Sequence, residues 1–378
     1  MRLFPYVLIL ILSIQCLKAQ IPNPKQLPYN WKTDTSKHTV RYKELKIVAE
    51  KDAIHTLDFP KFITRNDSLF NFYQHEPVIV FASGTDVRAY PLSILTLFEL
   101  SNDSLNGKQI MVTFCPTCNT SLVFNRNVKT KSGERLLQFG ISGLLMHNDM
   151  VMYDKETESW WEQLMGSAIA GEYSGVDLDV MPSILISVKD YFDRYPDGKI
   201  LSPEYTEAFY KKHTHRPFHN LEHHHKLTHK YYLPEKTDPR LPPLEHILDL
   251  HLDGHDRIYP FHALAQQQVV NETVGKTALV VFYHGETISV MDRDNLAKSK
   301  HVGSATAFNR NLNGVDYTFV KDGDYFVDEQ THSKWDITGY CREGSLKGKQ
   351  LWIIPHSNHF AFAYLAFYPN VEIYGQSK

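Results

Sequence analysis

The amino-acid sequence predicts an α+β protein in which a mainly antiparallel, β-rich unit with short helices occurs twice in tandem. Three observations lead to this prediction. Short runs of β-branched and aromatic residues are separated by Gly and Asp turn signals, which is typical of antiparallel hairpins. The few helical patterns do not alternate regularly with strands, as they would in a parallel βαβ protein. A set of residues from the first half of the chain also recurs in the same order in the second half.

The repeat is clearest in one short segment. Residues 154–161 read DKETESWW and residues 328–335 read DEQTHSKW, so that Asp, Thr, Ser and Trp recur at one constant separation. Upstream, Tyr90-Pro91 recurs as Tyr259-Pro260 at nearly the same separation. A shared order and spacing of this kind is not expected of chance similarity. We therefore expect an N-terminal extension at 20–74, a first copy at 75–200, a histidine-rich connector at 201–245 and a second copy at 246–374.

Each expected copy begins with a strand pair and a short helix. β-Branched residues flank the turn Gly84-Thr85-Asp86 in the first copy and Asp253-Gly254 in the second. A helix is expected next, and then an apolar strand with its hairpin partner. The expected segments are the hairpins 77–91 and 248–260, the helices 92–100 and 261–269, the strands 108–114 and 276–283, their partners 121–126 and 288–293, and the closing helices 188–196 and 359–369.

The composition excludes several classes of protein. The chain has 378 residues, 42% of them hydrophobic and 22% charged, with a formal net charge of −3. This apolar content can fill sizeable cores, which excludes full disorder. Because the net charge is near zero, the chain offers no electrostatic surface for nucleic acid, and no other partner is indicated. Four cysteines are too few for a disulfide-rich scaffold.

Residues 1–19 have the pattern of a secretory signal peptide. Arg2 gives a basic start, residues 7–14 form an apolar run, and Ala19 is a small residue at the expected cleavage position. The run is short for a membrane span, and no later stretch is apolar enough for one. We therefore expect an extracytoplasmic protein, periplasmic or secreted, without a transmembrane segment in the mature chain. A lipoprotein anchored through Cys16 is the weaker alternative.

The most specific local motif is Cys115-Pro116-Thr117-Cys118, which lies between two expected strands. Two thiols separated by two residues can share one metal ion or form one disulfide, and a turn presents both sulfurs on one side. The second copy has Tyr283-His284-Gly285 in the corresponding stretch and no thiol there. This difference predicts one functional copy beside one supporting copy.

Three functions fit this motif. In the favoured one, Cys115 and Cys118 bind a soft or borderline metal, copper or zinc, as one knuckle of a zinc ribbon does. In the second, the pair is the redox centre of a thiol–disulfide oxidoreductase, although such pairs usually precede a helix and here a strand is expected. In the third, the pair is a structural disulfide in a non-catalytic interaction module, although so short a loop gains only about 2 kcal/mol from a bridge. The sequence leaves open whether the protein is an enzyme.

A metal site would need further ligands, because the sequence has no second Cys pair. The segment 146–154, MHNDMVMYD, supplies several. Asp154 belongs to the repeated segment, which favours a structural turn that its side chain caps. Gln163 has no counterpart in the second copy, where Ile337 stands, and this difference favours a role in the site. The expected additional ligands or pocket residues are His147, Asp149, Met152, Asp154 and Gln163.

Histidines are concentrated in the expected connector. His219 and His223, separated by four residues, would lie on one face of a helix and could bind a metal there. An exposed, solvated linker is the alternative interpretation, and it is the one we favour. The segment is not a zinc-protease motif, because it lacks the HExxH spacing.

Several segments together resemble the DUF3179 family, a bacterial and archaeal family of unknown function. The resemblance covers about residues 45–374, and its most specific parts are the Cys-Pro-x-Cys turn and the MYD-x-x-T-x-S-x-W segment. It implies an exported or envelope-associated protein, and it brings no established activity or cofactor. The segments are KDAIHTLDFPKF (51–62), VRAYPLSIL (87–95), VTFCPTCNTSLVFNR (112–126), FGISGLL (139–145) and DMVMYDKETESWWEQLMG (149–166).

Overall fold

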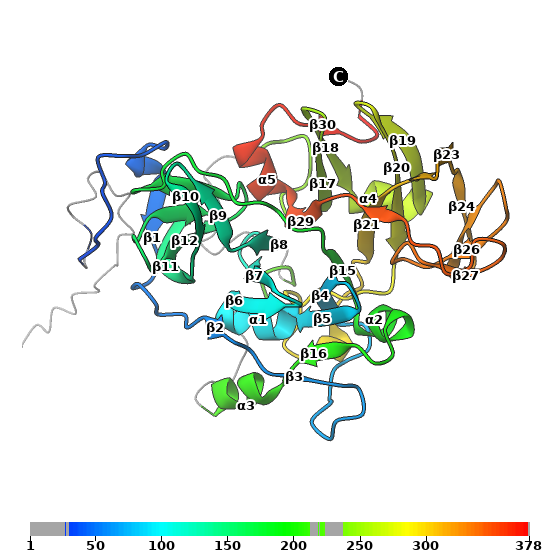
Figure 1. Ribbon diagram of the computed structural model, residues 1–378, viewed down its shortest axis with the longest axis horizontal. Helices are drawn as coiled ribbons and strands as arrows, with labels where there is room; N and C mark the ends of the chain where they lie inside the picture. Colours follow the sequence, from blue (N-terminus) through cyan, green and yellow to red (C-terminus); the bar gives the residue numbers. More distant parts are fainter. Residues whose placement is uncertain (1–26, 28–29, 212–217, 219, 224–236, 377–378) are drawn as a thin grey trace, which may run out of the picture.

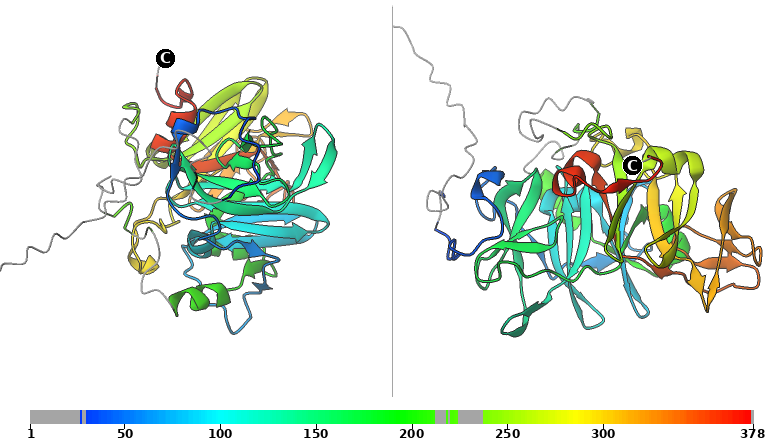
Figure 2. Two further views of the ribbon diagram at one scale, coloured as in Figure 1. Left: turned by 90° about the vertical axis from the view of Figure 1, so that its left-hand side faces the viewer. Right: turned by 90° about the horizontal axis from the view of Figure 1, so that it is seen from above.

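A computed structural model of the chain shows a row of β-sheets with a few short helices (Figures 1 and 2). It describes all residues except 1–26, 28–29, 212–217, 219, 224–236 and 377–378. Strands hold 44% of the residues and helices 12%. The predicted strand-rich, mainly antiparallel architecture is therefore confirmed. The expected signal peptide lies outside the described residues, and within them no helix has the length and apolarity needed to cross a bilayer.

The first half starts with the expected hairpin and helix. Strands β4 (Pro77–Ser83) and β5 (Asp86–Pro91) pair across a turn in which Gly84 has a φ of 62°, a left-handed conformation that glycine adopts without strain. Helix α1 (Leu92–Phe98) buries its apolar side chains beneath this hairpin. Strands β6 (Leu100–Leu105), β7 (Lys108–Cys115) and β8 (Thr120–Asn125) then form an antiparallel meander.

The second half has the same order of elements, with the same number of residues in each. They are β17 (His246–Leu252), β18 (His255–Pro260), α4 (Phe261–Gln267), β19 (Val269–Val274), β20 (Thr277–His284) and β21 (Ser304–Asn309). Each helix ends at a left-handed residue, Glu99 with a φ of 57° and Gln268 with a φ of 60°. The sequence patterns therefore predicted most of these elements close to their observed positions.

One expected strand is wrong. Residues 288–293 do not pair with β20. That strand pairs with β19 on one side and with β21 on the other, and a loop at 285–303 separates β20 from β21. Ile288, Val290 and Met291 are buried in a core that lies partly in the first half, so their apolar character has another cause. Polar residues follow immediately, and Asn295 caps the 3-10 helix η3 (Leu296–Lys298). A short apolar run alone does not distinguish such a buried loop from a strand.

The remaining strands form corresponding sheets in the two halves. In the first half, β11 (Phe139–Met146), β12 (Asp149–Asp154), β13 (Trp160–Glu162) and β14 (Ser167–Ala170) form one antiparallel sheet, and in the second half β24 (Phe319–Asp322), β25 (Tyr325–Asp328), β26 (Lys334–Trp335) and β27 (Cys341–Glu343) form another. The sheet orders β15-β4-β5-β16 and β29-β17-β18-β30 also correspond. The other elements are η2 (Tyr42–Glu44), β1 (Leu45–Ile47), β2 (Leu57–Asp58), β3 (Phe62–Ile63), β9 (Asn127–Thr130), β10 (Gly133–Leu136), β15 (Ile184–Ser187), α2 (Val188–Arg194), β16 (Lys199–Leu201), α3 (Glu204–Tyr210), β22 (Asn311–Leu312), β23 (Val315–Asp316), β28 (Trp352–Ile353), β29 (His356–Phe360), α5 (Ala361–Phe367) and β30 (Glu372–Ile373).

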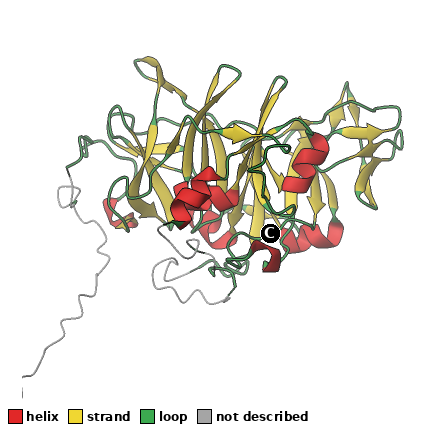
Figure 3. Ribbon diagram, turned by 90° about the horizontal axis from the view of Figure 1, so that it is seen from below, coloured by secondary structure: helices red, strands yellow, loops and turns green. Residues whose placement is uncertain are grey.

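The two halves share hydrophobic cores, and the N-terminal extension packs on the first half. One core cluster joins Phe124 to Phe360, and another joins Val80 to Phe282. Strands β1, β2 and β3 pair with β11, β6 and β16. Strands fill the body of the molecule and the short helices lie against them (Figure 3). Two core clusters thus contain residues of both halves, and each half also has a cluster of its own.

The repeated Asp-x-x-Thr-x-Ser-x-Trp segment forms the same turn in both halves. Asp154 Oδ1 accepts hydrogen bonds from Thr157 N at 2.6 Å and from Thr157 Oγ1 at 2.8 Å, and Asp154 Oδ2 accepts one from Trp161 Nε1 at 2.9 Å. Asp328 makes the corresponding bonds to Thr331 and Trp335, at 2.6, 2.7 and 2.9 Å. The structural interpretation of Asp154 therefore agrees with its contacts.

We predict that Asp154→Asn and Asp328→Asn each lower the free energy of unfolding by about 2 kcal/mol, because the amide of Asn would turn a donor toward the Trp N–H. Urea unfolding of the two variants measures this effect, with the exposed Asp197→Asn as the control. A much larger loss at one position than at the other would contradict the equivalence of the two turns.

Candidate functional site

The Cys-Pro-Thr-Cys motif forms the tight turn between β7 and β8. Cys118 N donates to Cys115 O at 3.3 Å, and Asn119 closes the turn with a φ of 56°. Both cysteines are buried, and their side chains approach to 3.8 Å without forming a disulfide. A disulfide would need about 2.05 Å between its sulfurs. The turn therefore holds two adjacent thiols inside the protein.

A second hairpin tip meets this turn. His147 and Asn148, with φ values of 49° and 72°, connect β11 to β12 and suit a two-residue hairpin loop. Thr117 Oγ1 donates to Asn148 O at 2.6 Å. The next residue, Asp149, is thereby brought to the thiols, and one ligand atom from each of Cys115, Cys118 and Asp149 lies within 4.8 Å of the others. Asp149 Oδ2 accepts a hydrogen bond from Leu164 N at 2.9 Å, whereas the buried Oδ1 has no partner.

Two further buried carboxyl groups belong to this region. Glu162 lies on β13, where its Oε2 accepts from Met165 N at 2.7 Å and its Oε1 has no partner. Glu99 follows α1 in its left-handed conformation, and its carbonyl oxygen accepts from Phe114 N at 2.8 Å. We call these five residues the acidic thiol cluster: Cys115, Cys118, Asp149, Glu162 and Glu99.

Burial controls the electrostatics of the acidic thiol cluster. It raises the pKa of both thiols, with nearby Asp149 adding to the effect. Burial also raises the pKa of Asp149 and, more strongly, that of Glu162, and burial with the Asp149 charge raises the pKa of Glu99 to about 8. Within the described part of the chain, no lysine, arginine or histidine forms an ion pair with these groups. The cluster is thus acidic, buried and without a protein cation.

The other expected site residues lie at varying distances from the thiols. Buried Gln163 donates through Nε2 to Thr113 Oγ1 at 2.8 Å and to Thr120 O at 3.2 Å, so it supports the β7–β8 hairpin beside the cluster. Met152 packs in the core opposite Trp161. The His147 ring lies against Phe367, with centroids 5.0 Å apart.

Two more predictions concern residues away from the thiols. Asp154 lies at the far end of β12 from Asp149, about 16 Å along the strand. In the connector, His223 Nδ1 lies 3.5 Å from Asp292 Oδ1, and His219 lies outside the described residues. The idea of a metal site made by His219 and His223 therefore stays a prediction.

Sequence reasoning missed Glu99. A comparison of the two halves could have identified it, because Glu99 and Gln268 occupy corresponding positions. Both follow the helix of their half in a left-handed conformation. The residue in the first half is acidic and its counterpart is neutral, the same kind of difference that drew attention to Cys115 and Gln163. Glu99 reaches the cluster only through the packing of α1 on β7, which the sequence does not reveal.

A cavity of about 520 Å³ lies beside the cluster. Leu164 and Met165 line it, and the backbone N–H groups of these residues donate to Asp149 and Glu162. This short segment is therefore the wall between the cavity and the cluster.

The second half supplies the opposite wall of this cavity. Phe360 N donates to Cys118 O at 2.7 Å, which joins β29 to the thiol turn. His359 lies within hydrogen-bond distance of Thr120 Oγ1 (Nδ1, 3.0 Å) and of Asp249 Oδ1 (Nε2, 3.2 Å). The cavity therefore needs both halves of the chain.

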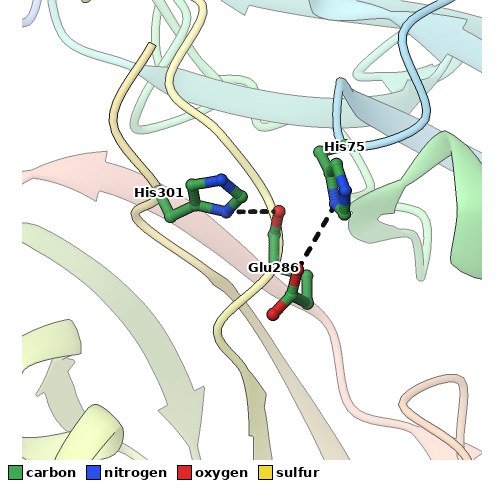
Figure 4. A group of neighbouring side chains, drawn as sticks. All are labelled: His75, Glu286 and His301. Carbon is green, nitrogen blue, oxygen red and sulfur yellow. Dashed lines mark hydrogen bonds and ion pairs between the residues drawn. The ribbon is translucent and has the colours of Figure 1, made fainter. Parts of the chain in front are cut away.

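A second group of potential metal ligands lies away from the thiols. His75 Nδ1 is 3.6 Å from Glu286 Oε2, and His301 Nδ1 is 2.9 Å from the carbonyl oxygen of Glu286 (Figure 4). One ligand atom from each residue lies within 4.8 Å of the others. His75 precedes β4, whereas Glu286 and His301 belong to the loop 285–303.

We predict that Glu99→Gln stabilises the metal-free protein by about 3 kcal/mol at pH 7 and has little effect at pH 4. The folded-state pKa of about 8 lies above the ordinary 4.5, so the unfolded chain loses this proton first and stability falls as the pH rises between these values. Urea unfolding in the presence of a chelator measures the effect, with the exposed Glu134→Gln as the control. The same change at both pH values would contradict it.

Among the comparisons with known proteins, the one with protein families gives a match. No curated protein matches the chain, and no solved structure matches it. The model of a family described as "Protein of unknown function (DUF3179)" matches residues 51–371, which include both halves, the thiol turn and Asp149. The chain therefore belongs to the DUF3179 family.

Proposed function

We propose that the protein binds one zinc ion in the acidic thiol cluster, with Cys115, Cys118 and Asp149 as ligands. The observation that carries this proposal is a set of three buried ligand atoms, all within 4.8 Å of one another, among acidic groups that form no ion pair with a lysine, arginine or histidine of the described residues. Bound zinc would deprotonate the thiols and neutralise the resulting charge. The side-chain groups that interact with the Asp149 carboxyl are Glu162 and the two thiols, which are themselves potential ligands of the same ion.

The separation of the thiols supports a tetrahedral ion. Two thiolates at about 2.3 Å from one tetrahedral zinc lie about 3.8 Å apart, and the side chains of Cys115 and Cys118 approach to 3.8 Å. Glu162 lies outside this group of three ligand atoms, and its carboxyl interacts with that of Asp149, so it is placed to support Asp149 or a bound water. The site needs little rearrangement to accept the metal.

The ligand set favours zinc over copper. Cu(I) prefers sulfur ligands, whereas a carboxylate oxygen beside two thiolates suits zinc. Met150 and Met152 are buried in the hydrophobic core.

A thiol–disulfide oxidoreductase has weaker support. Its attacking thiol needs a lowered pKa, which a helix N-terminus or a nearby cation usually provides. Here burial raises the pKa of both thiols and a strand, β8, follows the motif. A structural disulfide in an interaction module is the third candidate, and the unjoined cysteines argue against it.

We also propose that the two halves arose by tandem duplication and that the first kept or acquired the metal site. The equal lengths of six successive elements and the two identical Asp turns support this history. At the ends of β7 and β20, Cys115 corresponds to His284. The second half then acts as a support that closes the cavity. An extracytoplasmic location remains part of the proposal, and the sequence of residues 1–19 supports it.

We predict about one zinc per chain after reductive purification of His75→Gln/His301→Gln protein, which lacks the second group of potential ligands. In that background, Cys115→Ser, Cys118→Ser and Asp149→Asn should each weaken zinc binding at least about 100-fold, since even outer partners of a metal site contribute up to this much. Competition with a chromophoric chelator measures the affinity. The matched control is Cys341→Ser, because Cys341 is buried elsewhere and contacts Glu343 O at 3.2 Å.

Two outcomes would contradict this proposal. One is a metal content below a tenth of an ion per chain even after reconstitution with zinc. The other is zinc binding of unchanged affinity after the three substitutions in that same background, which would place the metal outside both groups of potential ligands.

A further inference from the structure

We propose that His75, Glu286 and His301 form a second zinc site, which clamps the loop 285–303 onto the segment that precedes β4. This site shares no residue with the acidic thiol cluster, and it does not depend on the function proposed for that cluster. Its ligands are two imidazoles and one carboxylate, a set that suits a borderline ion such as Zn²⁺.

The distances need only small adjustments. Two ligand atoms at about 2.0–2.1 Å from one tetrahedral zinc lie about 3.4 Å apart. His75 Nδ1 and Glu286 Oε2 are 3.6 Å apart, and the imidazole rings of His75 and His301 have centroids 5.4 Å apart. His75 Nδ1 is buried and has no hydrogen-bond partner, a state that usually costs free energy and that a metal bond would relieve.

The backbone holds the three residues in place without a metal. Ile288 N donates to His75 O at 2.9 Å, and Ile288 forms an isolated bridge with His301. Figure 4 shows His301 Nδ1 facing Glu286, where it is 2.9 Å from the carbonyl oxygen. Zinc binding through this nitrogen would exchange that hydrogen bond for a metal bond and move the ring proton to Nε2, so that a neutral imidazole binds the ion. The backbones of the ligand residues are therefore already in place before the ion binds, whereas the exposed Glu286 side chain has to be ordered.

The fourth coordination position has room for water. His75 and Glu286 line a cavity of about 570 Å³, and its other charged lining residues are Asp190, Asp324 and two ion pairs, Lys189–Asp193 and Arg342–Asp336. The carboxylates of Asp190 and Asp324 favour the approach of a cation. Three protein ligands with an open position are typical of a zinc ion that keeps one bound water.

Hydrogen–deuterium exchange of the protein with and without Zn²⁺ tests this site. We expect zinc to slow exchange in the loop 285–303 and in the segment around His75. His75→Gln and His301→Gln should each remove this protection, and the exposed His255→Gln should keep it. Protection should also persist in Cys115→Ser, which separates this site from the cysteine site.

A further variant separates this site from the connector. Replacement of His219, His224, His225 and His229 by Gln breaks the expected connector pair and keeps His223, which lies against Asp292. Zinc should still protect the loop in this variant. Loss of protection there, or equal protection in wild type and His301→Gln, would overturn the proposal. Absence of any zinc-dependent protection in the wild type would overturn it as well.

Discussion

Two thiols and three carboxyl groups lie buried in the first half of the chain, and no protein cation pairs with them among the described residues. Burying unpaired negative charge is costly, so these groups are either protonated or compensated by a bound ion. The pKa values move in the direction that keeps them protonated in the absence of an ion, and that of Glu99 rises to about 8. The proposed zinc ion removes this cost, because it binds the deprotonated thiols and lowers the local negative charge together.

The turn that carries Cys115 and Cys118 also takes part in the contact between the two halves. The thiol turn contacts the β11–β12 hairpin through Thr117 and contacts β29 of the second half through Phe360 N. Thr120, the first residue of β8, lies within hydrogen-bond distance of His359. The second half lacks the thiols, yet it covers the turn that carries them. It thereby contributes to the burial of Cys115 and Cys118.

The sequence predicts local features well and distant ones poorly. The Asp154 turn depends on bonds within seven residues, and its recurrence at Asp328 identified it as structural. The hairpins and short helices follow from residue patterns of similar length. The partner of β20 was predicted wrongly, because Ile288 and Val290 are apolar for packing against the first half rather than for pairing in a sheet.

Only part of the site could be predicted from the sequence, because the rest is brought together by long-range packing. Cys115 and Cys118 are neighbours in the sequence, and Asp149 was one of several residues in a segment rich in potential ligands. Nothing local distinguishes Asp149 from His147, whose ring lies against Phe367. Glu99 and the pair Glu286 and His301 are brought to their sites by long-range packing, which a single sequence does not reveal.

X-ray absorption at the zinc edge tests the central claim most directly, because it counts the atoms bound to the metal. For protein purified under reducing conditions and loaded with one equivalent of zinc, we expect two sulfur ligands at about 2.3 Å and oxygen or nitrogen ligands at about 2.0–2.2 Å. In Cys115→Ser, one sulfur should be lost. A spectrum with nitrogen and oxygen ligands alone, or a wild-type protein that retains no zinc, would contradict the account.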